Sequence, residues 1–391
     1  MTSERAWEQL GRLAGTKVWY GITRPGRPER DGVPMLRAGD IVDGQILSDH
    51  PVLIGRDVDG SSPQTRLQPG DVAVVLVGRV GEAAMVAAGQ EGWNVARSVG
   101  VVRCDDQELA QWLRLWLTAP TVRAWCAAKA SGSAQATLSL ANLRQLPIPL
   151  PPDEVRADLL SIMAAIEDKI ALNQRIASTS VALADAHFAL ATADQAAWPS
   201  LTFGEVLRAI PGSLAKPTAP DPAGDDGPTW VAPADVLRSP LPFLDLPAGR
   251  APEARPVEGL CPPDTLLLAS KPGELRVAIS LAPVVAGRGV LAVLPAEPAS
   301  ALWLLHEIRS RSTELSALGQ GTAAREISAR ALLRTRVSWP PLDERERFAQ
   351  LVGGLHSRAV TAGREDRVLR ALLADTLRNG LPALDAHAPA S

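Results

Sequence analysis

The chain has 391 residues, 46% of them hydrophobic, with a formal net charge of −3 and a pI near 6.0. This composition excludes a disordered chain, and the acidic balance argues against a protein that coats nucleic acid without sequence preference. The cysteines, Cys104, Cys126 and Cys261, show no CxxC spacing, so neither a disulfide framework nor a zinc site is expected. No run reaches the roughly eighteen apolar residues of a membrane span, and we expect a cytoplasmic protein without a membrane partner.

The first globule is expected over residues 1–150, which mix short strands with helical segments. Runs of β-branched and aliphatic residues, bounded by Gly, Pro and Asp turns, lie at 52–54, 72–77 and 99–102. A Trp-rich stretch at 109–125 follows with helical spacing. The proline-rich run at 146–152 predicts an extended connector, because each proline lacks an amide donor and restricts the residue before it.

Two long helices are expected, one at residues 151–195 and one within 340–391. Both segments open with two prolines and acidic residues, which helix N-termini favour, and both carry apolar residues at the 3-4 spacing of paired helices. We expect the pairing residues to be Leu159, Ile162, Ile166, Ile176, Leu183, Phe348, Leu351, Leu355, Leu369 and Leu372. The alternative for either stripe is a helix that packs only on its own globule.

The chain also repeats itself at a spacing of 189 residues. Residues 132–139 (GSAQATLS) return at 321–328 (GTAAREIS), and the prolines at 151–152 return at 340–341. A repeat this long indicates two copies of one globule-plus-helix unit, because solenoid repeats run only to tens of residues. Residues 196–339 are then a second, diverged globule. The expected fold class is α+β, with two similar α/β globules separated by two long antiparallel coiled-coil helices.

Catalytic motifs are missing from the sequence. It has no GxxxxGK[ST] phosphate loop, no GxGxxG opening a helix, no HExxH and no Asp/Asn-Pro-Pro-aromatic signature of DNA amino-methyltransferases. Its five histidines lie far apart in sequence without a recurring carboxylate, which favours packing or surface roles. We therefore expect no catalytic residue, no metal and no cofactor on this chain.

Several short motifs, in their order and spacing, resemble the specificity subunit of type I restriction-modification systems. They are GVP at 32–34, GDI at 39–41, LQPGD at 67–71, VGRVG at 77–81, GSAQ at 132–135 and the proline run with its long helix. In the second half KPGE at 271–274 replaces the VGRVG loop, and Ala324 stands where the first copy has Gln135.

The resemblance implies a non-catalytic protein with two target-recognition domains, each contacting one half of a split double-stranded DNA target. It implies that two antiparallel helices hold these domains apart and dock two copies of an adenine methyltransferase subunit. S-adenosylmethionine would be bound by that partner, and a motor-nuclease subunit is a further partner of the family.

Candidate DNA-contacting residues follow from side-chain chemistry, because arginine usually pairs with guanine, asparagine or glutamine with adenine, and lysine or serine with phosphate. In the first domain they are Lys17, Tyr20, Arg24, Arg37, Gly78, Arg79, Gly81, Asn94, Arg97, Ser133 and Gln135. In the second domain they are Lys216, Arg238, Lys271, Arg276, Arg288, Gln320 and Arg325. The alternatives are a solvated surface charge for each arginine and a mere tight turn for the two glycines.

Two other functions fit the sequence. One is an adaptor of the same architecture in another phage-defence methylation complex. Only the neighbouring genes would distinguish it from a specificity subunit of a restriction-modification system. The other is a scaffold whose globules bind proteins and whose helices dimerise. A steep salt dependence of DNA affinity would exclude the scaffold, because phosphate contacts release counterions.

Overall fold

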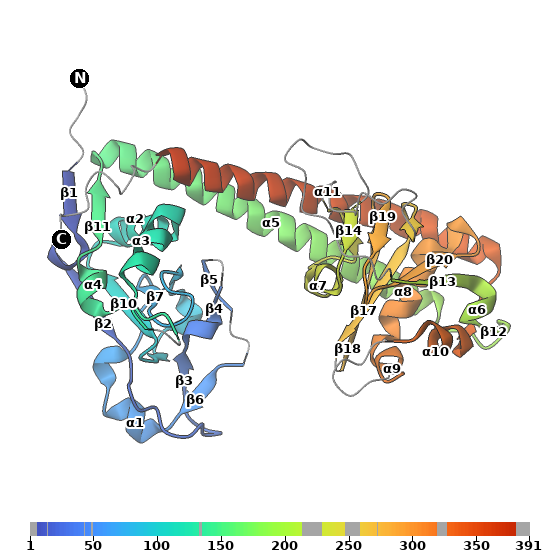
Figure 1. The fold of residues 1–391 in the computed structure, drawn as a ribbon, viewed down its shortest axis with the longest axis horizontal. Helices are drawn as coiled ribbons and strands as arrows, with labels where there is room; N and C mark the ends of the chain where they lie inside the picture. Colours follow the sequence, from blue (N-terminus) through green and yellow to red (C-terminus); the bar gives the residue numbers. More distant parts are fainter. Residues whose placement is uncertain are drawn as a thin grey trace. The chain divides into compact units, whose positions relative to one another are not determined.

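The computed structural model describes residues 6–13, 15–42, 44–47, 50–132, 135–212, 229–246, 259–271, 273–318 and 327–380. The chain divides into two compact units: the first is Met1–Lys169 with Val368–Ser391, and the second is Ile170–Arg367. Each unit contains one globule and a part of both long helices, α5 (Asp153–Ala191) and α11 (Leu342–Gly380) (Figure 1). Within the described residues, no helix has the length and apolar content needed to cross a membrane.

The first globule is built on an antiparallel sheet in the order β2-β10-β7-β8. Its main elements are β1 (Ala6–Gln9), β2 (Thr16–Tyr20), β3 (Val33–Leu36), β4 (Ile41–Val42), β5 (Gln45–Ile46), β6 (Val52–Ile54), α1 (Arg56–Gly60), β7 (Val72–Val75), β8 (Ala83–Met85), β9 (Asn94–Val95), β10 (Val99–Cys104), α2 (Gln107–Thr118), α3 (Pro120–Lys129), α4 (Leu140–Arg144) and β11 (Pro147–Leu150). Alternate residues of β7 face opposite ways: Val72 and Val74 join a core with Trp112 and Trp116, and Val75 joins a second core.

The proline run behaves as the sequence predicts. Residues of β11 pair antiparallel with β1, and its carbonyls remain free to accept other hydrogen bonds. The indole of Trp112 donates to the Pro149 carbonyl at 2.8 Å, and that of Trp116 donates to the Pro147 carbonyl at 2.9 Å. These bonds fix α2 against the extended connector, and both tryptophans are buried.

The second globule has the same plan, with a sheet in the order β13-β20-β17-β18-β15. Its elements are β12 (Ser200–Thr202), α6 (Phe203–Val206), β13 (Leu207–Pro211), β14 (Thr229–Val231), α7 (Pro233–Arg238), β15 (Phe243–Leu244), β16 (Leu260–Cys261), β17 (Leu266–Lys271), β18 (Glu274–Ser280), β19 (Val284–Ala286), β20 (Leu291–Pro295), α8 (Ala301–Ser310), α9 (Ser312–Ser316), α10 (Ala329–Arg334) and β21 (Arg336–Ser338).

The two globules correspond in the main strands of their central sheets. Lys17 of β2 lies opposite Arg103 of β10, as Arg208 of β13 lies opposite Leu294 of β20. Strand β3 pairs parallel with β9, as β14 does with β19, within sheets that are otherwise antiparallel at these positions. The pairing register of each central sheet is thus preserved, which is the physical counterpart of the duplicated sequence.

Side-chain contacts repeat at the 189-residue spacing as well. Arg156 of α5 forms an ion pair with Glu108 of α2 at 2.8 Å, and Arg345 of α11 forms one with Glu297. The hydroxyl of Ser139 caps α4 at 3.1 Å, and that of Ser328 caps α10 at 3.1 Å. Each globule is therefore attached to its own long helix by an equivalent contact.

The long helices pair antiparallel within the second unit. The amide of Asn173 donates to Glu365 at 3.0 Å, and the ring of Phe188 contacts that of Phe348 at 5.6 Å between centroids. A later residue of α5 therefore meets an earlier residue of α11, as antiparallel pairing requires. In the first unit, Leu373 of α11 packs on the core that contains Met163 of α5. An α+β chain with two long packed helices is confirmed.

The buried faces of the long helices coincide only in part with the stripe predicted from the sequence. Ile166 and Phe348 are buried, and Leu159, Ile176, Leu355 and Leu369 are half-buried. The prediction is wrong for four residues that remain exposed: Ile162 (51%), Leu183 (45%), Leu351 (56%) and Leu372 (49%). The physical reason is the helical phase, because the buried face of α5 lies one residue beyond the predicted one: Met163, Ala177 and Ala184 are buried in place of Ile162, Ile176 and Leu183. The predicted stripe followed the large aliphatic residues, whereas the buried face contains large and small residues, among them Ile170, Asn173, Phe188, Val352, Ala359 and Ala362.

Candidate nucleic-acid interface

A first group of predicted residues meets at the turn that precedes β4; we call Arg37, Gly78, Arg79 and Gln135 the loop patch. Arg37 holds the carboxylate of Asp40 with its backbone amide at 2.8 Å and its guanidinium at 3.1 Å. The guanidinium of Arg79 donates to the Ile41 carbonyl at 2.7 Å. About half of each arginine side chain stays exposed, 46% and 49%. Both guanidinium groups are therefore positioned but still accessible.

Glycines shape this patch through backbone conformation. Gly78 has a φ of 91°, its amide donates to the Ala136 carbonyl at 2.9 Å, and Gln135 lies beside it. Gly81 has a φ of 85° and is buried against Cys126, where an added Cβ would stand 3.0 Å from that side chain. Direct DNA contact by Gly81 is therefore contradicted, and it acts by turning the loop.

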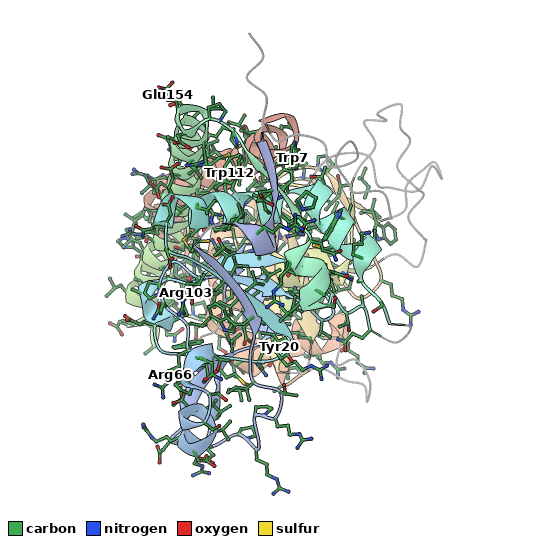
Figure 2. All side chains as sticks on the ribbon, turned by 90° about the vertical axis from the view of Figure 1, so that its left-hand side faces the viewer. Trp7, Tyr20, Arg66, Arg103, Trp112 and Glu154 are labelled. Atoms are coloured by element: carbon green, nitrogen blue, oxygen red, sulfur yellow. The ribbon has the colours of Figure 1, made fainter. Side chains whose placement is uncertain are left out.

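A second group lies where β2 and β9 end; we call Tyr20, Arg24 and Arg97 the strand-end patch. Tyr20 is labelled in Figure 2. Tyr20 is 45% exposed, and the amide of Arg97 donates to the Ile22 carbonyl at 2.9 Å. Among the described residues, neither Arg24 nor Arg97 has a side-chain partner, and both are exposed. Lys17 is also exposed but lies toward the opposite end of β2.

Asn94 is a correction to the prediction, because it is fully buried. Its amide nitrogen donates to Asp59 at 3.0 Å, and its amide oxygen accepts from the Thr65 hydroxyl at 2.6 Å. The hydrogen bond from Arg66, the largest influence on the group, lowers the pKa of Asp59. Asn94 therefore organises a buried polar network and is not available to read adenine.

A further arginine, Arg103, lies near Arg66, and both are labelled in Figure 2. Its guanidinium binds both carboxylate oxygens of Asp71 at 2.6 Å and lies 4.9 Å from the centre of the Trp19 ring. It also donates to the Arg66 carbonyl at 3.0 Å. The guanidinium of Arg103 is therefore engaged in contacts within the protein, and the side chain of its partner Asp71 is only 1% exposed.

Sequence reasoning missed three exposed arginines. Arg27 and Arg30 share the loop of Arg24, and within the described ranges neither has a side-chain partner. The signal that could have found them is an arginine at every third position between glycines and prolines. Arg208 escaped notice because its correspondence with Lys17 is visible only in the strand register.

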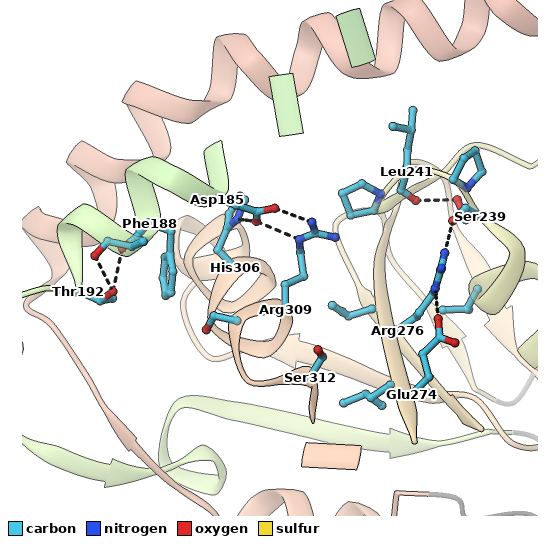
Figure 3. A pocket seen from close by; sticks show the side chains of 17 residues that line it. Asp185, Phe188, Thr192, Ser239, Leu241, Glu274, Arg276, His306, Arg309 and Ser312 are labelled. Carbon is cyan, nitrogen blue, oxygen red and sulfur yellow. Dashed lines mark hydrogen bonds and ion pairs between the residues drawn. The ribbon is translucent and has the colours of Figure 1, made fainter. Parts of the chain in front are cut away.

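In the second unit, Lys271 and Arg276 converge on one carboxylate, that of Glu274. Figure 3 shows Arg276 beside Glu274. Each cation lies 2.6 Å from it, and hydrogen bonds first from Lys271 and then from Arg276 lower the pKa of Glu274. Arg276 also donates to the Ser239 carbonyl at 3.0 Å, next to the exposed Arg238. Arg288 lies apart, in the turn after β19. Four predicted residues lie outside the described residues: Ser133, Lys216, Gln320 and Arg325.

A polar cluster joins α5, α8 and α11. Its members Asp185, His306 and Arg309 are labelled in Figure 3. Asp185 lies 2.7 Å from Nδ1 of His306, whose Nε2 lies 3.0 Å from Nε2 of His356. Burial alone would raise the pKa of Asp185, but hydrogen bonds from His306 and Arg309 outweigh it and lower that pKa strongly. Burial, and secondly the nearby His306, lowers the pKa of His356 to about 4.

A cavity of about 740 Å³ opens beside this cluster, lined by Asp185, Glu274, Arg276 and Arg309 among others. These charged groups are paired with one another: Arg309 holds Asp185 at 2.6 Å, and Arg276 holds Glu274. The arrangement joins elements of the second unit, and Arg276 (45% exposed) is more accessible than Arg309 (29%).

Residues 31–179 match the family model described as the type I restriction modification DNA specificity domain. Over 142 residues, 36% of this chain, the sequence is 27% identical to the type I restriction enzyme EcoBI specificity subunit of Escherichia coli. That match spans 30% of the relative's length. The fold resembles the crystal structure of a type I restriction-modification system S subunit from M. genitalium, with a TM-score of 0.56 and 12% identity over 97% of both chains.

Proposed function

We propose that this chain, whose residues 31–179 belong to the type I restriction-modification DNA specificity domain family, is a specificity subunit that reads a bipartite DNA target. The observation that carries the proposal is the second globule, which repeats the strand register of the first. Two equivalent globules on one chain suit a target in two halves, with unread sequence between them.

DNA contact in the first globule is proposed for the loop patch, the strand-end patch and Lys17. It is also proposed for Ser133, which precedes Gln135 of the loop patch in the sequence. In the second globule it is proposed for Arg238, Lys271, Arg276 and Arg288, together with Lys216, Gln320 and Arg325. The exposure of Arg24, Arg97, Arg238 and Arg288 supports this assignment. Phosphate contacts position such a protein and base contacts give it specificity.

We propose that the methyl transfer belongs to a partner adenine methyltransferase, two copies of which bind the long helices, and that S-adenosylmethionine binds there. Large apolar side chains that the helices leave exposed support a docking surface: Val155, Ile162, Leu172, Leu183 and Leu190 on α5, and Leu342, Leu351, Val368 and Leu372 on α11. In the second unit, a groove lined by Leu172, Leu183 and Leu355 offers a further apolar surface. Covering it would recover hydrophobic free energy. A motor-nuclease subunit is a further proposed partner.

Methylation mapping tests the proposal directly. Cells that carry the chain and its neighbouring methyltransferase are compared, by long-read sequencing, with cells that lack only this chain. We expect a split motif with methyl-adenine in both halves, present only with the chain. An unchanged methylation pattern, with the methyltransferase shown to be expressed and active, would contradict the proposal.

Ile162→Asp is expected to weaken methyltransferase binding roughly tenfold or more, because a charge replaces an apolar contact at the proposed docking surface. Ile162 is 51% exposed, so the fold should be retained. Isothermal titration with the purified partner measures the affinity. Ser161→Asp, which adds the same charge to the neighbouring exposed position, is the matched control and should bind nearly as the parent does. Equal losses in both variants would point to charge alone.

A further inference from the structure

One turn is built in the same way in both globules. After β9, the amide of Ala96 donates to a carbonyl of β3 at 2.9 Å; after β19, the amide of Gly287 donates to a carbonyl of β14 at 2.8 Å. The next residue is Arg97 in the first case and Arg288 in the second. The two arginines therefore occupy equivalent positions on equivalent turns.

A glycine holds each turn from the other side. Gly21 follows β2 so closely that an added Cβ would stand 1.8 Å from the Val95 carbonyl oxygen. Gly212 follows β13, and an added Cβ there would stand 2.0 Å from the Gly287 carbonyl oxygen. Because any side chain at either glycine would push this turn away, both turns are fixed by backbone packing.

The arginines themselves are among the proposed DNA contacts whose side chains are not held by the protein. Over the described ranges, neither Arg97 nor Arg288 has a side-chain hydrogen bond or ion pair, and both are exposed. By contrast, Arg37, Arg79 and Arg276 are held by carboxylates or carbonyls. A free guanidinium on a rigid turn is suited to reach an anion outside the protein.

We propose that Arg97 and Arg288 form a matched pair of phosphate contacts, one on each half-site, that bind DNA without reading its sequence. The inference rests on the proposed function. Two halves of a target differ in their bases but share the sugar-phosphate backbone, so a residue present in both globules suits the shared part.

Base reading then falls to the loops in which the copies differ. Between β7 and β8 the first globule presents Arg79 with Gln135 beside the loop, whereas the equivalent hairpin of the second globule presents Lys271 and Arg276 around Glu274. Divergence at these loops is what reading two different half-sites requires.

The test measures binding of the full chain to two DNA duplexes of unrelated sequence over a range of KCl concentrations. Arg97→Ala and Arg288→Ala should each reduce the slope of log affinity against log salt by about 0.9, to the same extent on both duplexes. The double variant should lose about twice as much. Arg12→Ala and Arg334→Ala are the controls, because both arginines are exposed and correspond to Glu205 and Gln145 in the other copy.

Slopes of Arg97→Ala and Arg288→Ala that match those of the controls would overturn the inference, as would a loss confined to one duplex, which marks a base contact. Parent binding without salt dependence would overturn the proposed function as well. Buried Cys126 and Cys261 should stay protected from a thiol reagent in every variant, which verifies that both globules are folded.

Discussion

Arg103→Ala is expected to lower the free energy of unfolding of the first unit by about 3 kcal/mol. Without the guanidinium, the Asp71 carboxylate stays buried and, among the residues that the structure describes, keeps the backbone amide of Gln68 at 2.8 Å as its one hydrogen-bond donor. The variant also loses the contact with Trp19 and the hydrogen bond to the Arg66 carbonyl. An unpaired buried charge is costly because little solvent compensates it.

Thiol labelling of the free cysteines in urea measures this loss for each unit separately. Cys126 is buried in the first unit and Cys261 in the second. The urea midpoint for Cys126 should fall in Arg103→Ala, while that for Cys261 should not change. Adding Asp71→Asn should restore part of the loss by removing the unpaired charge. If the double variant were no more stable than Arg103→Ala, an unpaired carboxylate would not be the cause.

Several features of the fold could be predicted from the sequence alone. The long helices and the extended proline run were predictable because local signals define them: acidic residues after two prolines, and prolines that cannot donate. The duplication was predictable because the Ser139 and Ser328 caps and the paired prolines recur at one spacing. These features depend on neighbouring residues and require no knowledge of distant contacts.

Other features depend on contacts that the sequence does not display. Asn94 has the chemistry of a base-reading residue, but its position in β9 buries it beside Asp59. Ile162 has the size of a seam residue, yet Met163 takes the buried position instead. Side-chain type suggests what a residue can do, whereas strand register and helix packing decide which side it faces.

Divergence between the copies also changes how each globule holds its long helix. In the first unit, Arg114 of α2 binds Glu167 of α5 through two hydrogen bonds of 2.9 Å. The positions 189 residues after Arg114 and Glu167 are Trp303 and His356, so the ion pair is not repeated. His356 instead contacts His306 of α8 at 3.0 Å. Acid sensitivity should therefore be greater in the second unit.

Lowering the pH from 7 to 4 is expected to reduce the stability of the second unit by about 3 kcal/mol through His356. The folded pKa of about 4 lies below the ordinary 6.5, because burial and His306 disfavour the charged ring. Between pH 6.5 and 4, His356 is protonated in the unfolded chain but neutral in the folded unit. The free energy of unfolding therefore falls as the pH falls. Asp185 has a lowered pKa, so its contribution is present above its ordinary 3.8 and is lost only in stronger acid.

His356→Gln isolates this effect, because the glutamine amide can still donate to His306 and cannot titrate in this range. Protection factors from hydrogen exchange, which are corrected for intrinsic pH dependence, report each unit between pH 7 and 4. In His356→Gln, the protection factors of β17 and β18 should fall much less between pH 7 and 4 than in the parent. In His50→Gln, which changes an exposed position, they should fall as in the parent. A full decline in His356→Gln would assign the acid sensitivity to other groups, and an equal decline in both units would contradict the special role of the histidine pair.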